Sequence, residues 1–498
     1  MNFIWNFPFL TIIFSLSSGV ICSVLKRKNA RRLCFTVLSA ILVMSILTLF
    51  YTIQLGEPYV YFMGHFSAPW GNEIKVGILE CLMASVFALV MILSLLGGLN
   101  HINHDVDSHK ENLYYTMIML LTSSLLSIVY TNDIFTGYVF VEINTIASCA
   151  LVMIRYKSGK ALVATLRYLI MSLLGSGLFL LGICTLYSIT GHLLMENIAI
   201  SVKELVTTGQ YLFPLAVVVA LFSMGLALKS ACFPFHTWLP DAHSNATVSS
   251  SSVLSGLVLK GYIFLLIKIF YRVLRMDVVS STHTMDILFV FGVLAMIYGS
   301  LRAIKEKDMK RMLAYSSVAQ VGYIYFGIGL GSVAGMSAAI MQIIVHALTK
   351  PMLFTSAGCF MDVSHGSKKF ADLKGAGLKD KVAGAAFVVG SLSMIGIPFF
   401  AGFIPKVYLS LASLEVLNLK MIVGLMALII STLLNACYYI PAIYTLFDGS
   451  SLHKDESNKL SNKLAHISLI VFMISNLLVG VCSSSIYSLI VQGLSMFA

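Results

Sequence analysis

Charged side chains are scarce in this sequence. Of its 498 residues only 11% are Asp, Glu, Lys or Arg, whereas 58% are hydrophobic. A soluble globular protein has about 25% charged and about 45–50% apolar residues. The shortage of charge excludes an ordinary soluble domain and indicates that most side chains face lipid or other helices. Because apolar runs occupy most of the length, we expect one integral membrane domain with short loops.

Cysteine motifs and nucleotide-binding fingerprints are also lacking. The nine cysteines lie singly within apolar runs, as Cys149 and Cys232 do, and the sequence has no CxxC motif and no Cys/His cluster. This pattern excludes a disulfide framework, and it indicates neither a zinc site nor an iron–sulfur site. We therefore expect no metal and no cofactor bound by this chain, so that any catalysis would come from partner subunits.

The sequence has an excess of positive charge, with a formal net charge of +11. In a soluble protein this charge would suggest a nucleic-acid partner, but here the basic residues cluster in loops on one side of the membrane. The first apolar run, Phe9 to Val24, precedes its basic cluster rather than following one. A secretory signal has the opposite polarity, so we expect this run to stay as the first helix.

Apolar runs of membrane-spanning length recur along the whole chain. A spanning helix needs about 20 apolar residues, and such runs predict fourteen spans, at 6–25, 33–53, 76–98, 113–131, 133–153, 162–190, 211–240, 250–271, 284–302, 310–330, 334–361, 382–413, 420–446 and 465–490. Alternate loops, starting with the first, hold about 22 Lys and Arg, and the other loops hold about five. The basic loops should be cytoplasmic. Both termini are therefore predicted on the outer side of the cell membrane, which requires an even number of spans.

Spans seven and twelve are unusually long and contain helix breakers. The run 211–240 contains Lys229 and Pro234, and the run 382–413 contains Pro398, Pro405 and Lys406. Paired Gly/Pro-interrupted segments beside charges are typical of inverted repeats in transporters. The predicted fold is an all-α polytopic membrane protein with broken helices seven and twelve. Its predicted parts are three N-terminal helices (1–112), two inverted five-helix repeats (113–271 and 284–446) and a last helix (465–498).

Several ionisable residues lie well inside the predicted spans. A charge at the centre of a bilayer costs at least about 2.5–3.5 kcal/mol, so these residues are candidates for function. The candidates are Glu142, Lys229, Lys260, His346, Lys350 and Lys406. His346 and Lys350 are four residues apart and share one helix face, which suits a relay, and Glu142 and Lys229 belong to one repeat and are able to pair.

Structural roles are the alternative for each of these residues. Lysines can snorkel to an interface, and Lys350 precedes Pro351 and can bond carbonyls that the proline leaves free. A structural role is favoured for Glu80, Arg167 and Lys268, which lie nearer to span ends or lack a motif. The segment HTWLPDAHS holds two histidines and an aspartate. We expect this segment to shape the inner end of span seven rather than to bind a metal.

Five motifs carry a resemblance to a known family. The stretches FPFHTWLPDAHS, LSGLVLKGYI, KDMKRMLAYSSVAQVGYI, IIVHALTKPMLFTSAG and GIPFFAGFIPK resemble the antiporter-type subunits of respiratory complex I, of Mrp cation/proton antiporters and of membrane-bound hydrogenases. The resemblance covers roughly 130–410 and implies the same fold of fourteen core helices in inverted repeats. The chain departs from the family in reading SNATVSSSS after PDAH, where prolines are usual, and in placing Pro351 after Lys350.

The resemblance also implies a role for each buried residue. Glu142 would be the fifth-helix glutamate and Lys229 its seventh-helix lysine partner, and Lys260 would be the connecting lysine of helix eight. His346 and Lys350 would continue a hydrated path at mid-membrane, and Lys406 would end it near the outer exit. In the family, protons or cations move along this axis, driven by a neighbouring redox module or by ion exchange.

These observations predict an ion-translocating subunit of a larger membrane complex. Its expected partners are other membrane subunits, including further antiporter-like subunits, and a peripheral redox arm. The residue set favours protons, while sodium stays an alternative ion. The rival hypotheses are a stand-alone cation transporter, a structural membrane subunit that has lost transport, and a redox enzyme in its own right.

Overall fold

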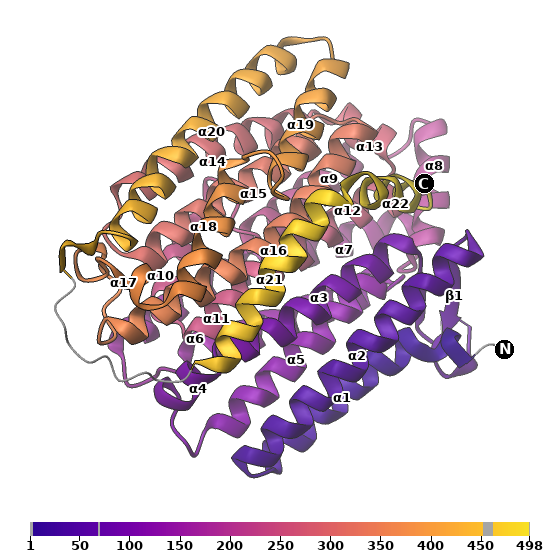
Figure 1. Ribbon diagram of the computed structural model, residues 1–498. Coiled ribbons are helices and arrows are strands. Elements are labelled where there is room, and N and C mark those ends of the chain that lie inside the picture. The colour runs from indigo at the N-terminus through magenta and orange to yellow at the C-terminus, as the bar shows by residue number, and fades with distance from the viewer. Residues whose placement is uncertain (1–2, 68–69, 452–461, 498) are drawn as a thin grey trace.

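The computed structural model describes residues 3–67, 70–451 and 462–497 and forms one helical bundle (Figure 1). Within these residues twelve helices are long and apolar enough to cross a membrane. This confirms the predicted all-α polytopic membrane protein. The count of fourteen spans stays a prediction, as do the two inverted repeats. Lys454 and Lys459, which belong to the last predicted basic loop, lie outside the described residues.

The N-terminal part packs three long helices beside the rest of the bundle. It comprises α1 (Phe7–Val24), α2 (Arg27–Leu55), the strands β1 (Tyr59–Phe62) and β2 (Glu73–Val76), α3 (Ile78–Gly97) and the short α4 (Leu99–Asp105). The two strands pair antiparallel. A bridge between Ile74 and Thr131 ties this hairpin to the end of the next long helix.

The middle part contains the first broken helix. It comprises α5 (Glu111–Tyr130), α6 (Ile134–Met153), α7 (Gly159–Thr190), α8 (Met195–Thr207), α9 (Leu212–Lys229), α10 (Trp238–Asn245), α11 (Val248–Val253), the π-helix η4 (Leu254–Val258), α12 (Leu259–Arg272) and α13 (Met276–Ser281). Asp133 begins α6 by accepting a hydrogen bond from the Thr136 amide at 2.6 Å. Helix α9 ends at Lys229, and Pro234 lies between α9 and the 3₁₀ turn Phe235–Thr237.

The last part contains the second broken helix. It comprises α14 (Thr284–Lys305), α15 (Met309–Gly329), α16 (Val333–Val363), α17 (Ala376–Lys379), α18 (Lys381–Ile395), α19 (Phe403–Glu415), α20 (Leu419–Leu446), α21 (Lys463–Val481) and α22 (Ser483–Ser495). Other 3₁₀ turns lie at Phe3–Asn6, Met63–His65, Phe370–Asp372 and Gly449–Ser451. Pro398 lies in the break between α18 and α19. Pro405, also predicted as a breaker, lies in the first turn of α19, where a helix tolerates proline because no backbone hydrogen bond is lost.

Pro351 lies inside α16 without ending it. Its ring packs against Gly256 of η4, where a Cβ atom would approach the proline Cγ to 2.5 Å. Glycine is therefore required at this contact between two distant segments. The contact places the π-helical turn beside the middle of α16, which holds two of the candidate residues.

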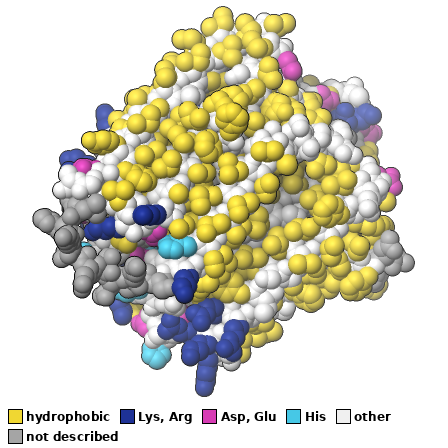
Figure 2. Space-filling model, in the orientation of Figure 1, with side chains coloured by type: hydrophobic (Ala, Val, Ile, Leu, Met, Phe, Trp, Pro, Cys, Tyr) yellow, Lys and Arg dark blue, Asp and Glu magenta, His cyan; other side chains and the backbone are white. Residues whose placement is uncertain are grey.

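The two ends of the bundle differ in charge. Figure 2 shows Lys and Arg gathered at the lower left of the visible face, while hydrophobic side chains cover its middle. Both ends of the chain lie at the opposite end of the bundle (Figure 1). The end that carries α4, α10 and α17 is called the basic end below.

Candidate functional site

Lys229 is the last residue of α9, so the break in the helix determines its position. Its side chain is fully buried (0% exposed), and its Nζ lies 3.5 Å from Glu142 Oε1 of α6. The same Nζ donates a hydrogen bond to Thr145 Oγ1 at 2.7 Å. A cation at a helix C-terminus is favoured by the helix dipole, so both the helix end and the carboxylate favour a charged lysine here. The predicted pair of Glu142 and Lys229 is therefore in ion-pair distance.

Hydroxyl and amide groups extend this pair toward α12. Thr145 Oγ1 lies 3.4 Å from the Tyr262 hydroxyl, which donates to Asn144 Oδ1 at 3.0 Å. The ring of Tyr262 lies 5.4 Å from Lys229 Nζ, close enough for a cation–π contact. Thr145 therefore connects Lys229 of α9 to Tyr262 of α12, the helix that also contains Lys260.

Lys260 of α12 and His346 of α16 are both fully buried. Lys260 is fully buried and follows η4, and its Nζ donates to the Ser255 carbonyl within that π-helix. Neither ring nitrogen of the buried His346 has a hydrogen-bond partner among the described residues. Lys260 and Lys350 both lie close enough to His346 to interact with it electrostatically. A π-turn is frequent at functional sites, and this one orients a buried lysine.

Lys350 is bound by three acceptors from two other helices. Its Nζ donates to the Leu313 carbonyl at 3.0 Å and to Ser316 Oγ at 2.8 Å, both on α15. It also donates to the Tyr439 hydroxyl of α20 at 3.2 Å. The carbonyl it binds belongs to α15, so the alternative role of satisfying carbonyls freed by Pro351 does not describe its contacts.

Lys406 lies at the second helix break. Its Nζ donates to the Ile395 carbonyl at the end of α18 at 2.6 Å and to Thr432 Oγ1 at 3.1 Å. The last carbonyls of a helix have no intrahelical partner, and this lysine supplies one. Lys229 and Lys406 therefore occupy related positions at the two breaks, but only Lys229 has a carboxylate beside it among the described residues.

Side chains of α20 join the surroundings of Lys350 and Lys406. The Tyr438 hydroxyl lies within hydrogen-bond distance of Ser316 Oγ, at 2.9 Å, and of Asn435 Oδ1, at 2.8 Å. Asn435 Nδ2 in turn lies 3.4 Å from the Tyr323 hydroxyl, whose ring is 5.1 Å from Lys406 Nζ. Tyr438 also lines a cavity of about 200 Å³ near the basic end. None of these tyrosines and amides is predicted from the sequence, because hydroxyl groups are common in membrane helices and only charges are costly there.

Glu80, Arg167 and Lys268, for which the sequence favours a structural role, each bind another described residue. Glu80 and Arg272 form a buried ion pair at 2.6 Å. Lys268 donates to carbonyls at the end of α5, including that of Thr131 at 3.0 Å. Arg167 pairs with Asp241 at 2.6 Å.

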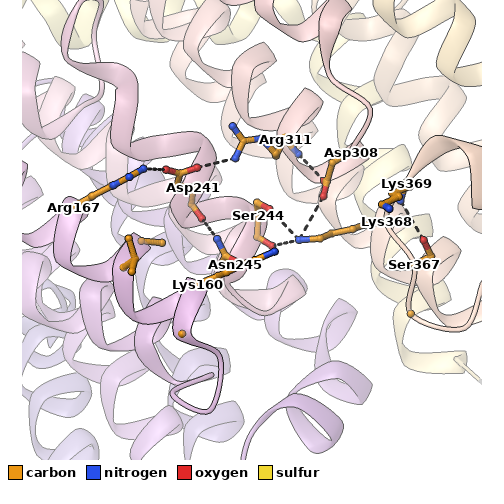
Figure 3. A pocket seen from close by; sticks show the side chains of 14 residues that line it. Lys160, Arg167, Asp241, Ser244, Asn245, Asp308, Arg311, Ser367, Lys368 and Lys369 are labelled. Carbon is orange, nitrogen blue, oxygen red and sulfur yellow. Dashed lines mark hydrogen bonds and ion pairs between the residues drawn. The ribbon is translucent and has the colours of Figure 1, made fainter.

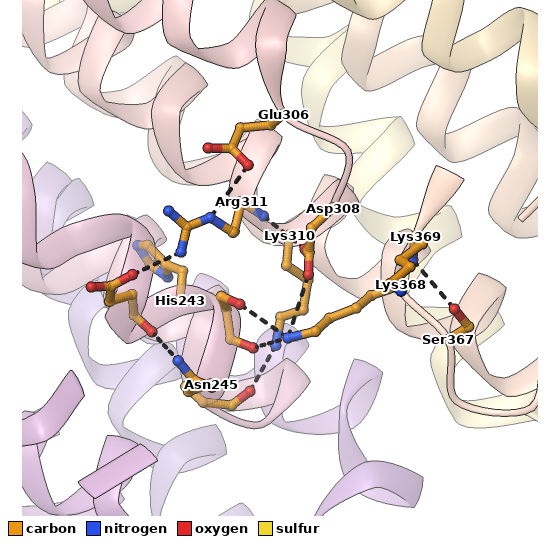
Figure 4. Close-up of polar contacts among 12 residues, drawn as sticks. His243, Asn245, Glu306, Asp308, Lys310, Arg311, Ser367, Lys368 and Lys369 are labelled. Atoms are coloured by element: carbon orange, nitrogen blue, oxygen red, sulfur yellow. Dashed lines mark hydrogen bonds and ion pairs between the residues drawn. The ribbon is translucent and has the colours of Figure 1, made fainter. Parts of the chain in front are cut away.

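Asp241 belongs to a charged cluster at the basic end, and Figure 4 shows Glu306, Lys310 and Arg311 of this cluster. Arg311 of α15 binds Asp241 at 2.7 Å, and Arg311 also pairs with Glu306. Lys310 donates to the Ala246 carbonyl at 2.7 Å. In the part of the chain that the structure describes, no group of three or more His, Cys, Asp or Glu side chains is arranged to hold a metal ion.

The fold and these residues match a known family. Residues 131–435 match the model of the NADH:quinone oxidoreductase/Mrp antiporter transmembrane family. The chain is 32% identical over 444 residues to NADH-quinone oxidoreductase subunit N of Desulforudis audaxviator, covering 88% of this chain and 86% of that protein. It is 29% identical over 398 residues to a Na⁺/H⁺ antiporter subunit of Alkalihalophilus pseudofirmus, covering 79% of this chain and 77% of that protein.

Two solved structures share the fold. One is the membrane-bound sulfane sulfur reductase, an archaeal respiratory membrane complex, with a TM-score of 0.86 at 24% identity over 99% of this chain and 96% of that chain. The other is the Mrp complex of a Dietzia species, with a TM-score of 0.85 at 20% identity over 99% and 97%. These comparisons confirm the family resemblance that the motifs carry.

Proposed function

The chain belongs to the NADH:quinone oxidoreductase/Mrp antiporter transmembrane family, and we propose that it is an ion-translocating subunit of a multi-subunit membrane complex. Protons move through it along Glu142, Lys229, Lys260, His346, Lys350 and Lys406. The observation that carries the proposal is the fully buried Lys229 held 3.5 Å from Glu142 at a helix break. An idle subunit gains nothing from the cost of inserting such charges.

The groups along this axis favour protons. Lysine and histidine bind and release protons, whereas sodium, a hard cation, is bound by carboxylates and carbonyls. Glu142 is the single carboxylate of the proposed path, and Lys350 and Lys406 are bound by hydroxyls and carbonyls. Exchange with sodium would then take place in a partner subunit.

The cavity lined by Tyr438 supports a route from the basic end. Tyr438 OH, Ser316 Oγ and Lys350 Nζ form a continuous chain, with separations of 2.9 and 2.8 Å. Hydroxyl groups are able to accept one proton and donate another. A proton entering the cavity would therefore reach Lys350 through two hydroxyls. With the basic loops cytoplasmic, this entry faces the cytoplasm and both termini face outward.

The complex supplies the driving reaction. The energy for translocation comes from a redox module or from an ion gradient. The other membrane subunits couple this energy source to the present chain. We propose the first repeat (113–271) and the second repeat (284–446) as the two halves of the path. Gentle purification followed by identification of the co-purifying subunits distinguishes a hydrogenase-like or iron–sulfur module from small antiporter subunits.

The flux test compares two lysine variants in the reconstituted complex. Lys229→Ala should abolish coupled proton flux. Lys420→Ala is the matched control, because it also removes an ion-paired lysine, bound to Asp286 at 2.6 Å, but one outside the path. Equal flux in Lys229→Ala and wild type would contradict the proposal and favour a structural subunit, and flux from the purified chain alone would favour a stand-alone transporter.

A further inference from the structure

A cavity of about 690 Å³ opens at the basic end, away from the proposed path. The start of α7, helix α10, the start of α15 and the segment 366–369 line it (Figure 3). Its wall contains Arg167 and Asp241 on one side, and Lys368 reaches across to bind the Ser244 carbonyl at 2.7 Å. The cavity is therefore built from both halves of the chain.

Positive charge is in excess around this cavity. Five cationic side chains line it, against the two carboxylates Asp241 and Asp308. Asp241 is already shared by two arginines, and Asp308 lies 3.5 Å from Lys368. Lys160 and Lys369 also line the cavity, and neither side chain makes a hydrogen bond or ion pair with another described residue. An anion is the ligand that these two free ammonium groups would bind.

The cavity continues into an apolar surface along α7. Val163 lines the cavity and is 50% exposed, and Leu166 and Ile170 follow it on the same helix at 57% and 58% exposed. Residues three and four apart lie on one helix face. The surface therefore passes from positive charge to exposed hydrocarbon within two helical turns, as the two ends of a phospholipid require.

The start of α7 adds a third feature. Ser158 precedes this 32-residue helix, and its side chain makes no capping hydrogen bond. The first amides of a helix lack intrahelical partners and favour anions. Lys160 lies in this first turn, so its ammonium group and the helix end act on the same place.

We propose that this cavity binds the phosphate of an anionic phospholipid from the cytoplasmic leaflet. Lys160 and Lys369 contact the phosphate oxygens, and the acyl chains lie along Val163, Leu166 and Ile170. Basic pockets between membrane helices on the cytoplasmic side bind such headgroups. The lipid links the two halves of the chain at the basic end, since Lys160 belongs to α7 and Lys369 to the segment that follows α16.

The test titrates the purified full-length protein, with its co-purifying subunits, with phosphatidylglycerol or phosphatidylcholine and measures binding by native mass spectrometry. One lysine near an anionic headgroup changes affinity about fivefold, so Lys160→Ala/Lys369→Ala should bind phosphatidylglycerol about 30-fold more weakly. Lys305→Ala/Lys379→Ala is the control, because it removes two exposed lysines from the same end outside the cavity. The control should bind within about twofold of wild type. Both double variants should keep the wild-type melting temperature without lipid, because none of the four substituted lysine side chains makes a hydrogen bond or ion pair with another described residue.

Three outcomes would overturn the proposal. The first is equal phosphatidylglycerol affinity in the cavity variant and in its control. The second is competition by inorganic phosphate as strong as that by the lipid, which would assign the site to a soluble anion. The third is a partner subunit that occupies the cavity in the purified complex and leaves no bound lipid.

Discussion

Removing the charge of Glu142 is the most direct perturbation of the proposed path. At 3.5 Å and an effective dielectric constant of about 20, two unit charges attract by about 5 kcal/mol. Glu142 is 23% exposed, so solvent weakens this attraction, and breaking a buried pair typically costs about 3–5 kcal/mol. We take about 3 kcal/mol for Glu142→Gln, at the lower end of that range.

This magnitude exceeds what the membrane supplies. A potential of 100 mV acting on one charge corresponds to about 2.3 kcal/mol. A membrane potential of this size therefore cannot make up for the stabilisation of charged Lys229 that the variant loses. About 3 kcal/mol is a factor of about 150 in an equilibrium constant. We expect Glu142→Gln to lower proton flux about 100-fold.

The assay is proton uptake by proteoliposomes that contain the purified complex, followed with a pH-sensitive dye. Glu142→Asp is the control, because it keeps the charge while shortening the side chain by one methylene. It should retain most of the flux. Wild-type flux in Glu142→Gln would contradict a role for this charge in proton transfer, and so would an equal loss in both variants, since the shape of the side chain rather than its charge would then be responsible.

Three further predictions concern α20 and two buried cations. Tyr438→Phe removes the hydroxyl that leads through Ser316 to Lys350, and it should lower proton flux about tenfold, as expected for the loss of one hydrogen bond. Tyr444→Phe, on the exposed face of the same helix, should leave the flux unchanged. Equal flux in the two variants would exclude this route. Lys268→Met removes the hydrogen bonds to the end of α5 and should destabilise the protein by about 1.5–3 kcal/mol, measured as a lower melting temperature. Proton flux per folded molecule should be unchanged. A loss of flux without a loss of stability would place Lys268 in the path. Glu80→Gln leaves Arg272 buried and unpaired and should cost about 3–5 kcal/mol; adding Arg272→Met should raise the melting temperature again, and a further fall would contradict the ion-pair account.

The charged part of the site is predictable from the sequence because charge is costly in a membrane. Lys229 and Lys406 stand out beside Pro234 and Pro398, and the structure places each lysine at a helix break. The bounds of the unbroken helices α1, α3, α5 and α6 lie within a few residues of the apolar runs that predict them, since hydrocarbon thickness sets their length. The pairing of Glu142 with Lys229 is expected because both residues lie in one predicted repeat, and the family resemblance implies the same pair.

The neutral part of the site is not predictable in the same way. Thr145 binds Lys229, but it also donates to the Val141 carbonyl of its own helix at 2.9 Å. Most Ser and Thr side chains in helices make such bonds to their own backbone, so a threonine carries no signal of function. The interruption between α21 and α22 is not predicted, because predicted span fourteen contains no proline. Gly480, near the end of α21, allows this helix to approach Phe399 in the break between α18 and α19.

The contrast between the two helix breaks has an electrical consequence. Lys229 with its carboxylate is neutral as a pair, whereas among the described residues Lys260, Lys350 and Lys406 have no carboxylate within ion-pair distance. If protons follow the proposed path, each proton that reaches one of these three lysines adds an uncompensated charge to a medium of low dielectric constant, where neighbouring cations repel one another. In the proposed path a second proton is therefore admitted easily only after the first has left, so Lys260, Lys350 and Lys406 together carry one charge at a time.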